Sequence, residues 1–181
     1  MKVIGICGSL RNNSLNKVVI NELKELSSDT FTVEVVSIGD LPLFNGDLEE
    51  GGDPSVVHRF KDQLAQADGL LIVSPEYSHG VPGVLKNALD WAGSMTNVNV
   101  LDKKPAMVIG ASPSAVGTAL SQVQIKQTLS ACGAYVLPQP EVFIGTAHER
   151  IGDGRVTDED TISILKDVNL KFSNWIKRFL H

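Results

Sequence analysis

Short apolar runs alternate with longer helical patterns along the whole chain. The runs have the continuous apolar character of parallel strands buried on both faces, and the stretches between them space apolar residues three or four apart. The predicted strands cover residues 2–7, 31–37, 69–74, 106–111 and 134–137. This alternation predicts an α/β fold in which a doubly wound, five-stranded parallel sheet carries helices on both faces.

Start and stop signals delimit the predicted helices. The first helix has apolar positions at helical spacing from Leu15 to Leu26, and Asp53-Pro54 predicts a cap followed by a proline at the first helical position. Pro82 predicts the start of a helix that continues to Trp91. A fourth helix is expected from 118 to 131 with Gly133 as its stop, and a last one after 157–160. The last continues to Phe179, with these side chains facing the sheet: Leu165, Val168, Phe172, Trp175, Ile176 and Phe179.

The predicted connections are polar or rich in glycine. They cover residues 39–52, 75–83, 112–117 and 138–154, together with the loop after the first strand. In doubly wound sheets, ligands bind outside the carboxyl ends of the strands, where the strand order reverses. A functional site is therefore expected in the loops after strands one, three and four.

Length and charge narrow the class of protein. The 181 residues fit one domain spanning 1–181, and the net charge of -5 disfavours nonspecific binding to nucleic acid or an anionic membrane. Cys7 and Cys132 lie in apolar stretches without the spacing of a zinc or redox pair, which favours buried structural roles. No signal segment precedes the first strand and no apolar run approaches the ~20 residues of a membrane span, so the cytoplasm is the expected location.

The loop after the first strand has the composition of a phosphate cradle. It reads Gly8-Ser9-Leu10-Arg11-Asn12-Asn13-Ser14-Leu15-Asn16 and joins a strand to the start of a helix. Unpaired amides and the helix dipole stabilise an anion there. Ser9, Ser14 and Asn16 are candidate neutral donors and Arg11 is the cation of this segment. The alternative is that the serines and asparagines only cap the helix, but they and the arginine together exceed what one cap requires.

A second unusual loop follows the third strand, at residues 74–83. Two prolines, Pro75 and Pro82, fix the backbone around a short polar segment, and Tyr77 offers an aromatic face. A stiff backbone edge beside an aromatic ring suits a flat heterocycle. For Tyr77 and His79, an exposed loop position or a partner contact is an equal alternative, and Glu76 could instead bind neighbouring amides.

The helix after this loop carries polar residues without an assigned chemistry. Lys86, Asn87 and Asp90 are interpreted as a solvated or subunit-facing surface, and Trp91 as a packing residue. The four histidines are scattered, and no serine or cysteine stands in a nucleophile-elbow pattern. No metal ligands and no catalytic side chains are therefore assigned.

Taken in order, the two loops and the following Gly83-Val84-Leu85-Lys86-Asn87-Ala88-Leu89-Asp90-Trp91 resemble the NADPH-dependent FMN reductase family. The resemblance covers nearly the whole chain and implies a flavodoxin-like fold with strand order 2-1-3-4-5. It implies FMN as cofactor and NADPH or NADH as co-substrate. The implied phosphate site comprises Ser9, Arg11, Ser14, Leu15 and Asn16, and the implied ring site comprises Pro75, Glu76, Tyr77, Ser78, Ser112 and Gly117.

The chain departs from the family pattern at three positions. Ser78 stands where an asparagine is frequent, and Val116 lies in a loop where paired glycines are common. Lys126 stands where an arginine is common in the following helix, and a lysine does not offer the bidentate pairing between subunits that an arginine can make. These departures place the difference from the family at the ring pocket and at the subunit contact.

The resemblance also implies a reaction. Hydride passes from NAD(P)H to flavin N5, and two electrons then pass to a small acceptor such as a free flavin, a quinone, an azo dye or an oxidised metal species. Backbone donors in 76–78 and 112–117 are expected to stabilise negative charge on the reduced flavin. The resemblance further implies a homodimer or homotetramer.

Two other functions remain open at this point. A flavodoxin-type electron carrier would hold FMN but usually has a Thr-Gly-Asn-Thr run where this chain has Arg11. An FMN-binding redox sensor without turnover is the other alternative. A dinucleotide site of the Rossmann type fits poorly because no Gly-x-Gly-x-x-Gly follows the first strand.

Overall fold

The computed structural model describes residues 1–27 and 29–180, and its centre is a parallel sheet. The sheet comprises β1 (Lys2–Cys7), β2 (Thr32–Val36), β3 (Gly69–Val73), β4 (Pro105–Ala111), β5 (Tyr135–Val136) and β6 (Val142–Ile144). Its order is β2-β1-β3-β4-β5, with β6 also paired to β4, and every pair is parallel. The predicted order 2-1-3-4-5 is therefore confirmed.

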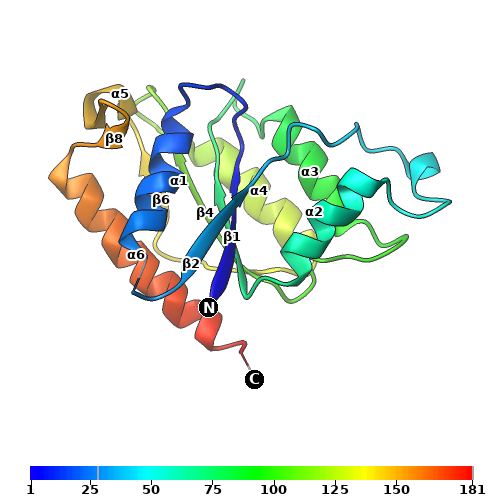
Figure 1. Cartoon of the computed structure of the whole chain (residues 1–181). Helices are drawn as coiled ribbons and strands as arrows, with labels where there is room; N and C mark the ends of the chain where they lie inside the picture. The colour runs from blue at the N-terminus through cyan, green and yellow to red at the C-terminus, as the bar shows by residue number, and fades with distance from the viewer. Residues whose placement is uncertain (28, 181) are drawn as a thin grey trace.

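Helices cover both faces of this sheet (Figure 1). One face carries α1 (Leu15–Leu26) and α6 (Glu159–Lys177), and the other carries α2 (Ser55–Ala65), α3 (Gly83–Gly93) and α4 (Ala119–Ala131). Alternate strand residues supply the two cores: Ile4 and Leu70 face α2, α3 and α4, whereas Val3 and Leu71 face α1 and α6. Because both faces are buried, the strands read as continuous apolar runs.

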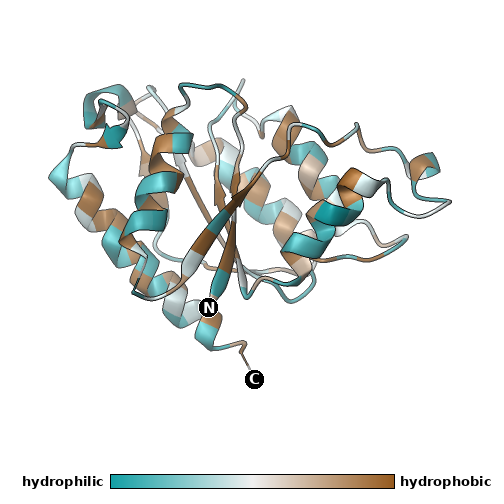
Figure 2. Ribbon diagram, in the orientation of Figure 1, coloured by the Kyte–Doolittle hydropathy of each residue, from teal (hydrophilic) through white to brown (hydrophobic). Residues whose placement is uncertain are grey.

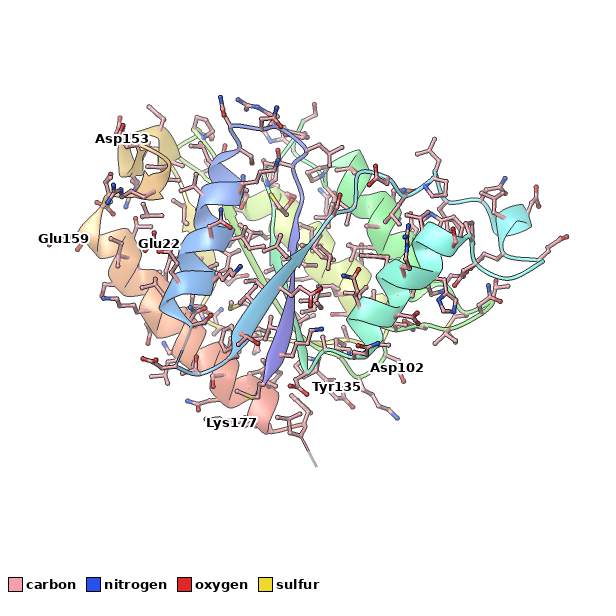
Figure 3. All side chains as sticks on the ribbon, viewed as in Figure 1. Glu22, Asp102, Tyr135, Asp153, Glu159 and Lys177 are labelled. Carbon is pink, nitrogen blue, oxygen red and sulfur yellow. The ribbon has the colours of Figure 1, made fainter. Side chains whose placement is uncertain are left out.

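The surface layer is polar. In Figure 2 the strands are mainly brown, and the helices change from brown on the side of the sheet to teal on the outside. Figure 3 shows Asp153 and Glu159 at the outer boundary of the molecule. Within the described residues, no helix is long and apolar enough to cross a membrane.

The fifth strand position differs from the prediction. The expected strand at 134–137 accounts only for β5, which pairs with the first two residues of β4, and β6 pairs with the last three residues of β4. Pro138 and Pro140 separate the two pieces because proline has no N–H to donate to a ladder. The remainder of the expected loop 138–154 also contains short elements: α5 (Ala147–Arg150), β7 (Ile151–Gly152) and, just beyond it, β8 (Arg155–Val156).

Helix boundaries were predicted to within about two residues, with two errors at the starts. Pro54 and Pro82 are N-cap residues with extended backbone rather than first helical residues. Asp53 does not cap α2 but forms an ion pair with Lys61, with Asp53 Oδ2 and Lys61 Nζ 2.8 Å apart. Gly133 ends α4 with a φ of 82°, as expected for a left-handed stop.

The apolar residues predicted along the last helix fall into two groups. Leu165, Val168, Phe172 and Ile176 are buried against the sheet, but α6 ends at Lys177. Trp175 and Phe179 are only half-buried and contact the sheet edge at Tyr135, whose carbonyl accepts from Trp175 Nε1 at 2.7 Å and whose ring stacks on Phe179.

The segment 42–44 crosses α3 and explains the polar residues predicted there. Asn87 donates to the Pro42 carbonyl at 2.9 Å and accepts from Phe44 N at 2.7 Å, and Trp91 Nε1 donates to the same carbonyl at 2.8 Å. Trp91 is fully buried, which confirms its packing role, whereas Lys86 and Asp90 form an exposed ion pair of 2.6 Å. Asn87 is therefore a buried structural residue and not a solvated one.

The cysteines are unpaired. Cys7 is buried as predicted, but Cys132 is only half-buried. Burial raises the pKa of both thiols, and the nearby Asp90 carboxylate raises the pKa of Cys132 further. Both side chains are therefore kept in the weakly reactive thiol form.

Candidate functional site

The loop between β1 and α1 presents buried hydroxyl groups at the start of a helix. Ser9 and Ser14 are 3% and 4% exposed. Ser14 is the N-cap residue of α1, yet its side chain makes no capping hydrogen bond, and the first turn of α1 holds no acidic residue. Capping alone does not explain Ser14. The hydroxyl and the first-turn amides are suited to an external anion.

The Asn16 side chain is used differently from the prediction. Asn16 Nδ2 donates to the Ala111 carbonyl at 2.9 Å, and Ala111 N donates to Asn16 Oδ1 at 2.9 Å. Asn16 is 2% exposed, and this pair of hydrogen bonds ties the first turn of α1 to the carboxyl end of β4. The side chain is thus a structural clamp, and only the backbone N–H of Asn16 is left to face a phosphate.

Two cations lie at this helix start. Arg11 is exposed and Lys17 half-buried, and neither forms an ion pair with a carboxylate of the described residues. A lysine in the first turn opposes the helix dipole, so an anion is needed to offset the positive potential. The sequence interpretation missed Lys17, although its place in the first turn was a usable signal. Lys17 lines grooves of about 430 and 450 Å³ on either side of α1.

The loop after β3 folds back into a tight turn. Tyr77 N donates to the Gly80 carbonyl at 3.2 Å and Gly80 N donates to the Tyr77 carbonyl at 2.9 Å. Ser78 and His79 form the tip with φ of 50° and 60°, the pair of left-handed residues that a two-residue type I′ turn requires. Asparagine and glycine are favoured there, which gives a conformational reason for the asparagine that Ser78 replaces.

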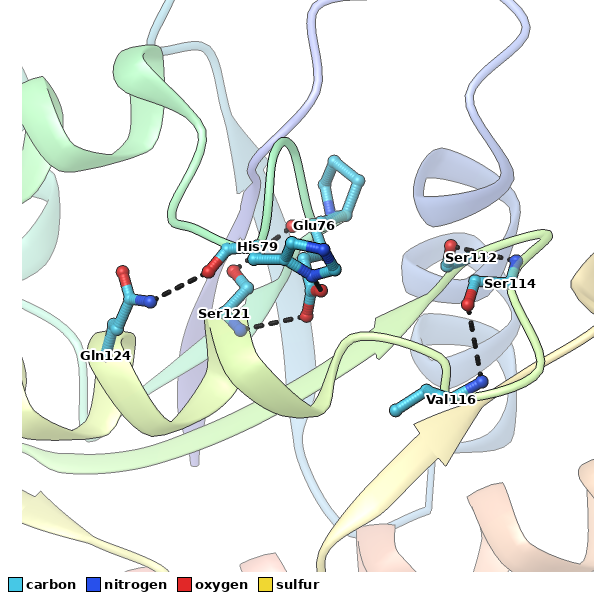
Figure 4. Close-up of polar contacts among 8 residues, drawn as sticks. Glu76, His79, Ser112, Ser114, Val116, Ser121 and Gln124 are labelled. Atoms are coloured by element: carbon cyan, nitrogen blue, oxygen red, sulfur yellow. Dashed lines mark hydrogen bonds and ion pairs between the residues drawn. The ribbon is translucent and has the colours of Figure 1, made fainter.

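Glu76 links this loop to α4 (Figure 4). Its Oε2 accepts from Ser121 N at 3.0 Å, in the first turn of α4, and its Oε1 lies 3.3 Å from His79 Nδ1. The N-cap residue Thr118 makes no side-chain capping bond, so the carboxylate of Glu76 caps this helix from another loop. Glu76 therefore binds a neighbouring amide, one of the two roles considered from the sequence.

The loop after β4 is held by its own serines. Ser112 Oγ accepts from Ser114 N at 3.2 Å, Ser114 Oγ accepts from Val116 N at 3.4 Å, and the loop ends at Gly117 with a φ of 68°. A Cβ at Gly117 would lie 3.1 Å from the Phe143 backbone. Val116 is 64% exposed, and its side chain extends away from the core. The backbone of this loop is thus fixed beside the other two.

The three loops converge on one pocket of about 80 Å³. Tyr77 Oη lies 3.4 Å from Ser9 Oγ and joins the first and second loops. The pocket is lined by Ser9, Arg11, Ser14, Leu15, Asn16, Pro75, Glu76, Tyr77, Ala111, Ser112 and Pro113. Most of the predicted residues therefore meet there. Ser78 and Gly117 do not line it, and Ala111 and Pro113 were missed because they belong to an apolar strand end and a proline loop.

The donor set fits the phosphate of FMN. The buried hydroxyls of Ser9 and Ser14, the first-turn amides of α1 and the guanidinium of Arg11 meet in one pocket, and the polar loop with Tyr77 adjoins them. Among the described residues, no group of three or more histidine, cysteine, aspartate or glutamate side chains could hold a metal ion. Fold and site together define a flavodoxin-like flavin-binding protein.

Comparisons with known proteins identify the family. The sequence profile of the family described as NADPH-dependent FMN reductase matches residues 1–149. A 2-hydroxy-1,4-benzoquinone reductase of Burkholderia sp. is 39% identical over 178 residues, covering 98% of this chain and 97% of the relative. An NAD(P)H-dependent FMN reductase of Pseudomonas aeruginosa is 36% identical over 179 residues, covering 98% and 96%. The chain belongs to the NADPH-dependent FMN reductase family.

Solved structures agree with this assignment. The flavoenzyme NAD(P)H:acceptor oxidoreductase FerB of Paracoccus denitrificans superposes with a TM-score of 0.90 at 37% identity, covering 98% of each chain. An archaeal flavodoxin has a TM-score of 0.66 at 17% identity and shares the fold alone. The protein is an FMN-dependent NAD(P)H oxidoreductase, which confirms the enzyme over the carrier.

Proposed function

We propose that this pocket anchors FMN by its phosphate and that the adjoining loops hold the flavin ring for reduction of a quinone-class acceptor. The supporting observation is the convergence of Ser9, Arg11 and Ser14 with Pro75–Tyr77 and Ser112 in one pocket. Leu15 and Asn16 contribute backbone amides of the helix start, and Ser78 and Gly117 are assigned to the outer margin of the ring site.

The residues of the chain bind and orient, and they stabilise charge. FMN, when bound, supplies the chemistry: hydride from NAD(P)H is accepted at N5 and two electrons are passed to the acceptor. The Arg11 guanidinium and the Ser9 and Ser14 hydroxyls hold the phosphate, while the fixed amides of 76–78 and 112–117 offset negative charge on the reduced ring. The hydrogen bonds that Asn16, Glu76 and Tyr77 make between the loops preorganise these groups before ligand binding.

The names of relatives and the open site both favour a quinone as the acceptor. Relatives named quinone reductase, such as that of Escherichia coli at 34% identity over 182 residues, support a quinone. Tyr77 is 47% exposed and Val116 64% exposed, so apolar surface flanks the place where a flat acceptor would enter. Free flavins, azo dyes and oxidised metal species are further acceptors of this open geometry.

The test is an absorption spectrum of the purified protein, followed by a measurement of NAD(P)H turnover. Purified protein is expected to be yellow, to lose its flavin absorbance when NADPH or NADH is added without oxygen, and to regain it when a benzoquinone is added. Steady-state consumption of NAD(P)H with the quinone then measures turnover. Colourless protein that takes up no FMN, or a flavin that NAD(P)H does not bleach, would overturn the proposal.

We also infer that the chain is a single domain over 1–181, assembles as a homodimer or homotetramer, and works in the cytoplasm. The support for assembly is apolar surface on α4, where Leu120 is 48% and Val123 59% exposed. Lys126, on the same helix, pairs with Glu141 of its own chain at 2.7 Å. Its charge is thus compensated within one subunit, and apolar contact carries the proposed interface.

A further inference from the structure

The tip of the loop after β3 holds a histidine in a strained conformation. Ser78 and His79 both have positive φ, a conformation that residues with a Cβ rarely adopt. Gln124 Nε2 of α4 donates to the His79 carbonyl at 2.9 Å, and the paired Tyr77 and Gly80 close the turn. Such strain persists only where the surrounding structure holds it, so the position of His79 is fixed from two sides.

This position places the imidazole on a carboxylate of the site. His79 Nδ1 lies 3.3 Å from Glu76 Oε1, and the histidine side chain is 82% exposed whereas that of Glu76 is 12% exposed. Figure 4 shows the two side chains together above the start of α4. Glu76 lines the pocket assigned to FMN, so a group that changes the net charge of this pair changes the charge beside the flavin.

Among the described residues, His79 is the ionisable side chain that pairs with Glu76. From α4, uncharged Ser121 and Gln124 face the loop. The helix α3 that follows carries Lys86 and Asp90 paired with each other, and the phosphate loop contributes Arg11. Histidine is the side chain whose charge ordinarily changes between about pH 5 and 8.

We propose that His79 is a positioning residue that sets, through Glu76, the reduction equilibrium of the bound flavin as a function of pH. With neutral His79 the pair carries one negative charge, which disfavours electrons on the flavin. With protonated His79 the pair is neutral and the reduced flavin gains stability. The inference rests on the proposed FMN site, and it assigns His79 no part in holding FMN.

The direction and size of the expected change in flavin reduction follow from electrostatics. Neutralising the charge of Glu76, in a partly solvated site, changes an equilibrium beside it by about threefold to tenfold. At about pH 5.5, where an ordinary imidazole is mostly charged, the wild type is expected to hold about threefold to tenfold more reduced flavin than a variant without the imidazole. At about pH 8.5 the two proteins are expected to agree.

The experiment measures the ratio of reduced to oxidised bound FMN at a fixed solution potential, set by a reference dye, across this pH range. His79→Asn is the test variant because asparagine tolerates positive φ and keeps a hydrogen bond to Glu76 without a change of charge. His79→Gln is a second variant. Glu76→Gln, which keeps an acceptor for Ser121 N, is expected to hold about threefold to tenfold more reduced flavin than the wild type at the same high pH.

A matched control comes from α2, where His58 Nδ1 lies 2.8 Å from Asp62 Oδ2 on an exposed surface. His58→Asn removes the same kind of pair outside the pocket and is expected to leave the ratio unchanged at every pH. Equal ratios for wild type and His79→Asn at low pH would overturn the inference, as would loss of FMN from both His79 variants. A wild type that takes up no FMN would instead overturn the proposed function.

Discussion

At the scale of single residues, the site separates groups that face a ligand from groups that hold the loops. Ser14 makes no capping bond, although its hydroxyl contacts the Cys7 thiol, and Arg11 makes no ion pair within the described chain. Asn16 and Glu76 have hydrogen-bond partners in Ala111 and Ser121. Replacing a residue that faces the ligand should therefore weaken ligand binding, whereas replacing a residue that holds the loops should weaken the fold.

Replacing Arg11 tests a residue that faces the ligand. Arg11→Ala is expected to weaken FMN binding by about tenfold to a hundredfold, the value of one charge-assisted hydrogen bond, with little change in the urea midpoint of the FMN-free protein. Fluorescence titration of the FMN-free protein measures the Kd. Lys166→Ala, which removes an exposed cation on α6, is the control and should leave the Kd unchanged. An unaltered Kd in Arg11→Ala would refute the phosphate assignment.

Replacing Asn16 tests a residue that holds the loops. Asn16→Ala leaves the N–H and carbonyl of Ala111 buried without partners, and each unmet group costs about 1–3 kcal/mol. The free energy of unfolding in urea is therefore expected to fall by at least about 2 kcal/mol without FMN present. Asn12→Ala, at an exposed position of the same loop, is the control. Equal stability of both variants would show that the clamp contributes nothing.

At the scale of elements, the long loop before α2 is fastened by a buried ion pair. Asp53 and Lys61 are 7% and 5% exposed in their side chains, and Asn97 Nδ2 donates to Asp53 Oδ1 at 2.9 Å. Burial works to raise the pKa of Asp53, but the hydrogen bonds from Lys61 and Asn97 outweigh it and the pKa is lowered. The pair thus connects the segment before α2 to α2 itself and to the segment after α3.

This lowered pKa gives a prediction for stability against pH. A carboxyl whose folded pKa lies below its unfolded value contributes stability above the unfolded value, and loses it as pH falls through the folded value. Asp53→Asn is expected to cost about 3 kcal/mol at pH 7, since it leaves Lys61 buried without a counter-charge. The difference from wild type should shrink below about pH 4.

Urea unfolding at both pH values measures this difference. Asp62→Asn, which removes the exposed partner of His58, is the control and is expected to change stability by less than about 1 kcal/mol. A difference between wild type and Asp53→Asn that stays constant from pH 7 to below pH 4 would contradict the linkage argument.

At the scale of the whole molecule, α4 carries apolar residues on its outer side as well as its inner side. Ile125 and Leu129 are buried, while Leu120 and Val123 are about half exposed or more, at 48% and 59%. A helix at the surface of a monomer ordinarily has one apolar stripe. The second apolar side of α4 is the physical reason for proposing a subunit interface there.

Substitution on this outer side tests the assembly. The double variant Leu120→Asp with Val123→Asp is expected to sediment as a monomer at concentrations where the wild type sediments as a dimer or tetramer, because buried charge opposes an apolar interface. Ile164→Asp with Leu170→Asp, at exposed apolar positions of α6, is the control and should sediment like the wild type. A monomeric wild type would remove the proposal.

Some elements could be predicted from the sequence more accurately than others, for physical reasons. Strands β1, β3 and β4 were predicted almost to the residue because burial on both faces leaves an unbroken apolar signal. The strand β6 was missed because three residues after two prolines carry no periodicity of their own, and they are ordered by pairing with β4. The start of α2 was misplaced because the ion pair of Asp53 with Lys61 is not visible as a local cap.

The sequence by itself determined the alternation of strands and helices, the three loops at the carboxyl ends, and the residues in them that suit a flavin phosphate. These follow from local periodicity and from backbone chemistry that neighbouring residues carry. Only the tertiary structure decided which polar side chains are committed to the fold, as Asn16 is to Ala111 and Glu76 to Ser121. Their partners are far apart in the chain, and a hydrogen bond between distant segments leaves no trace in local pattern.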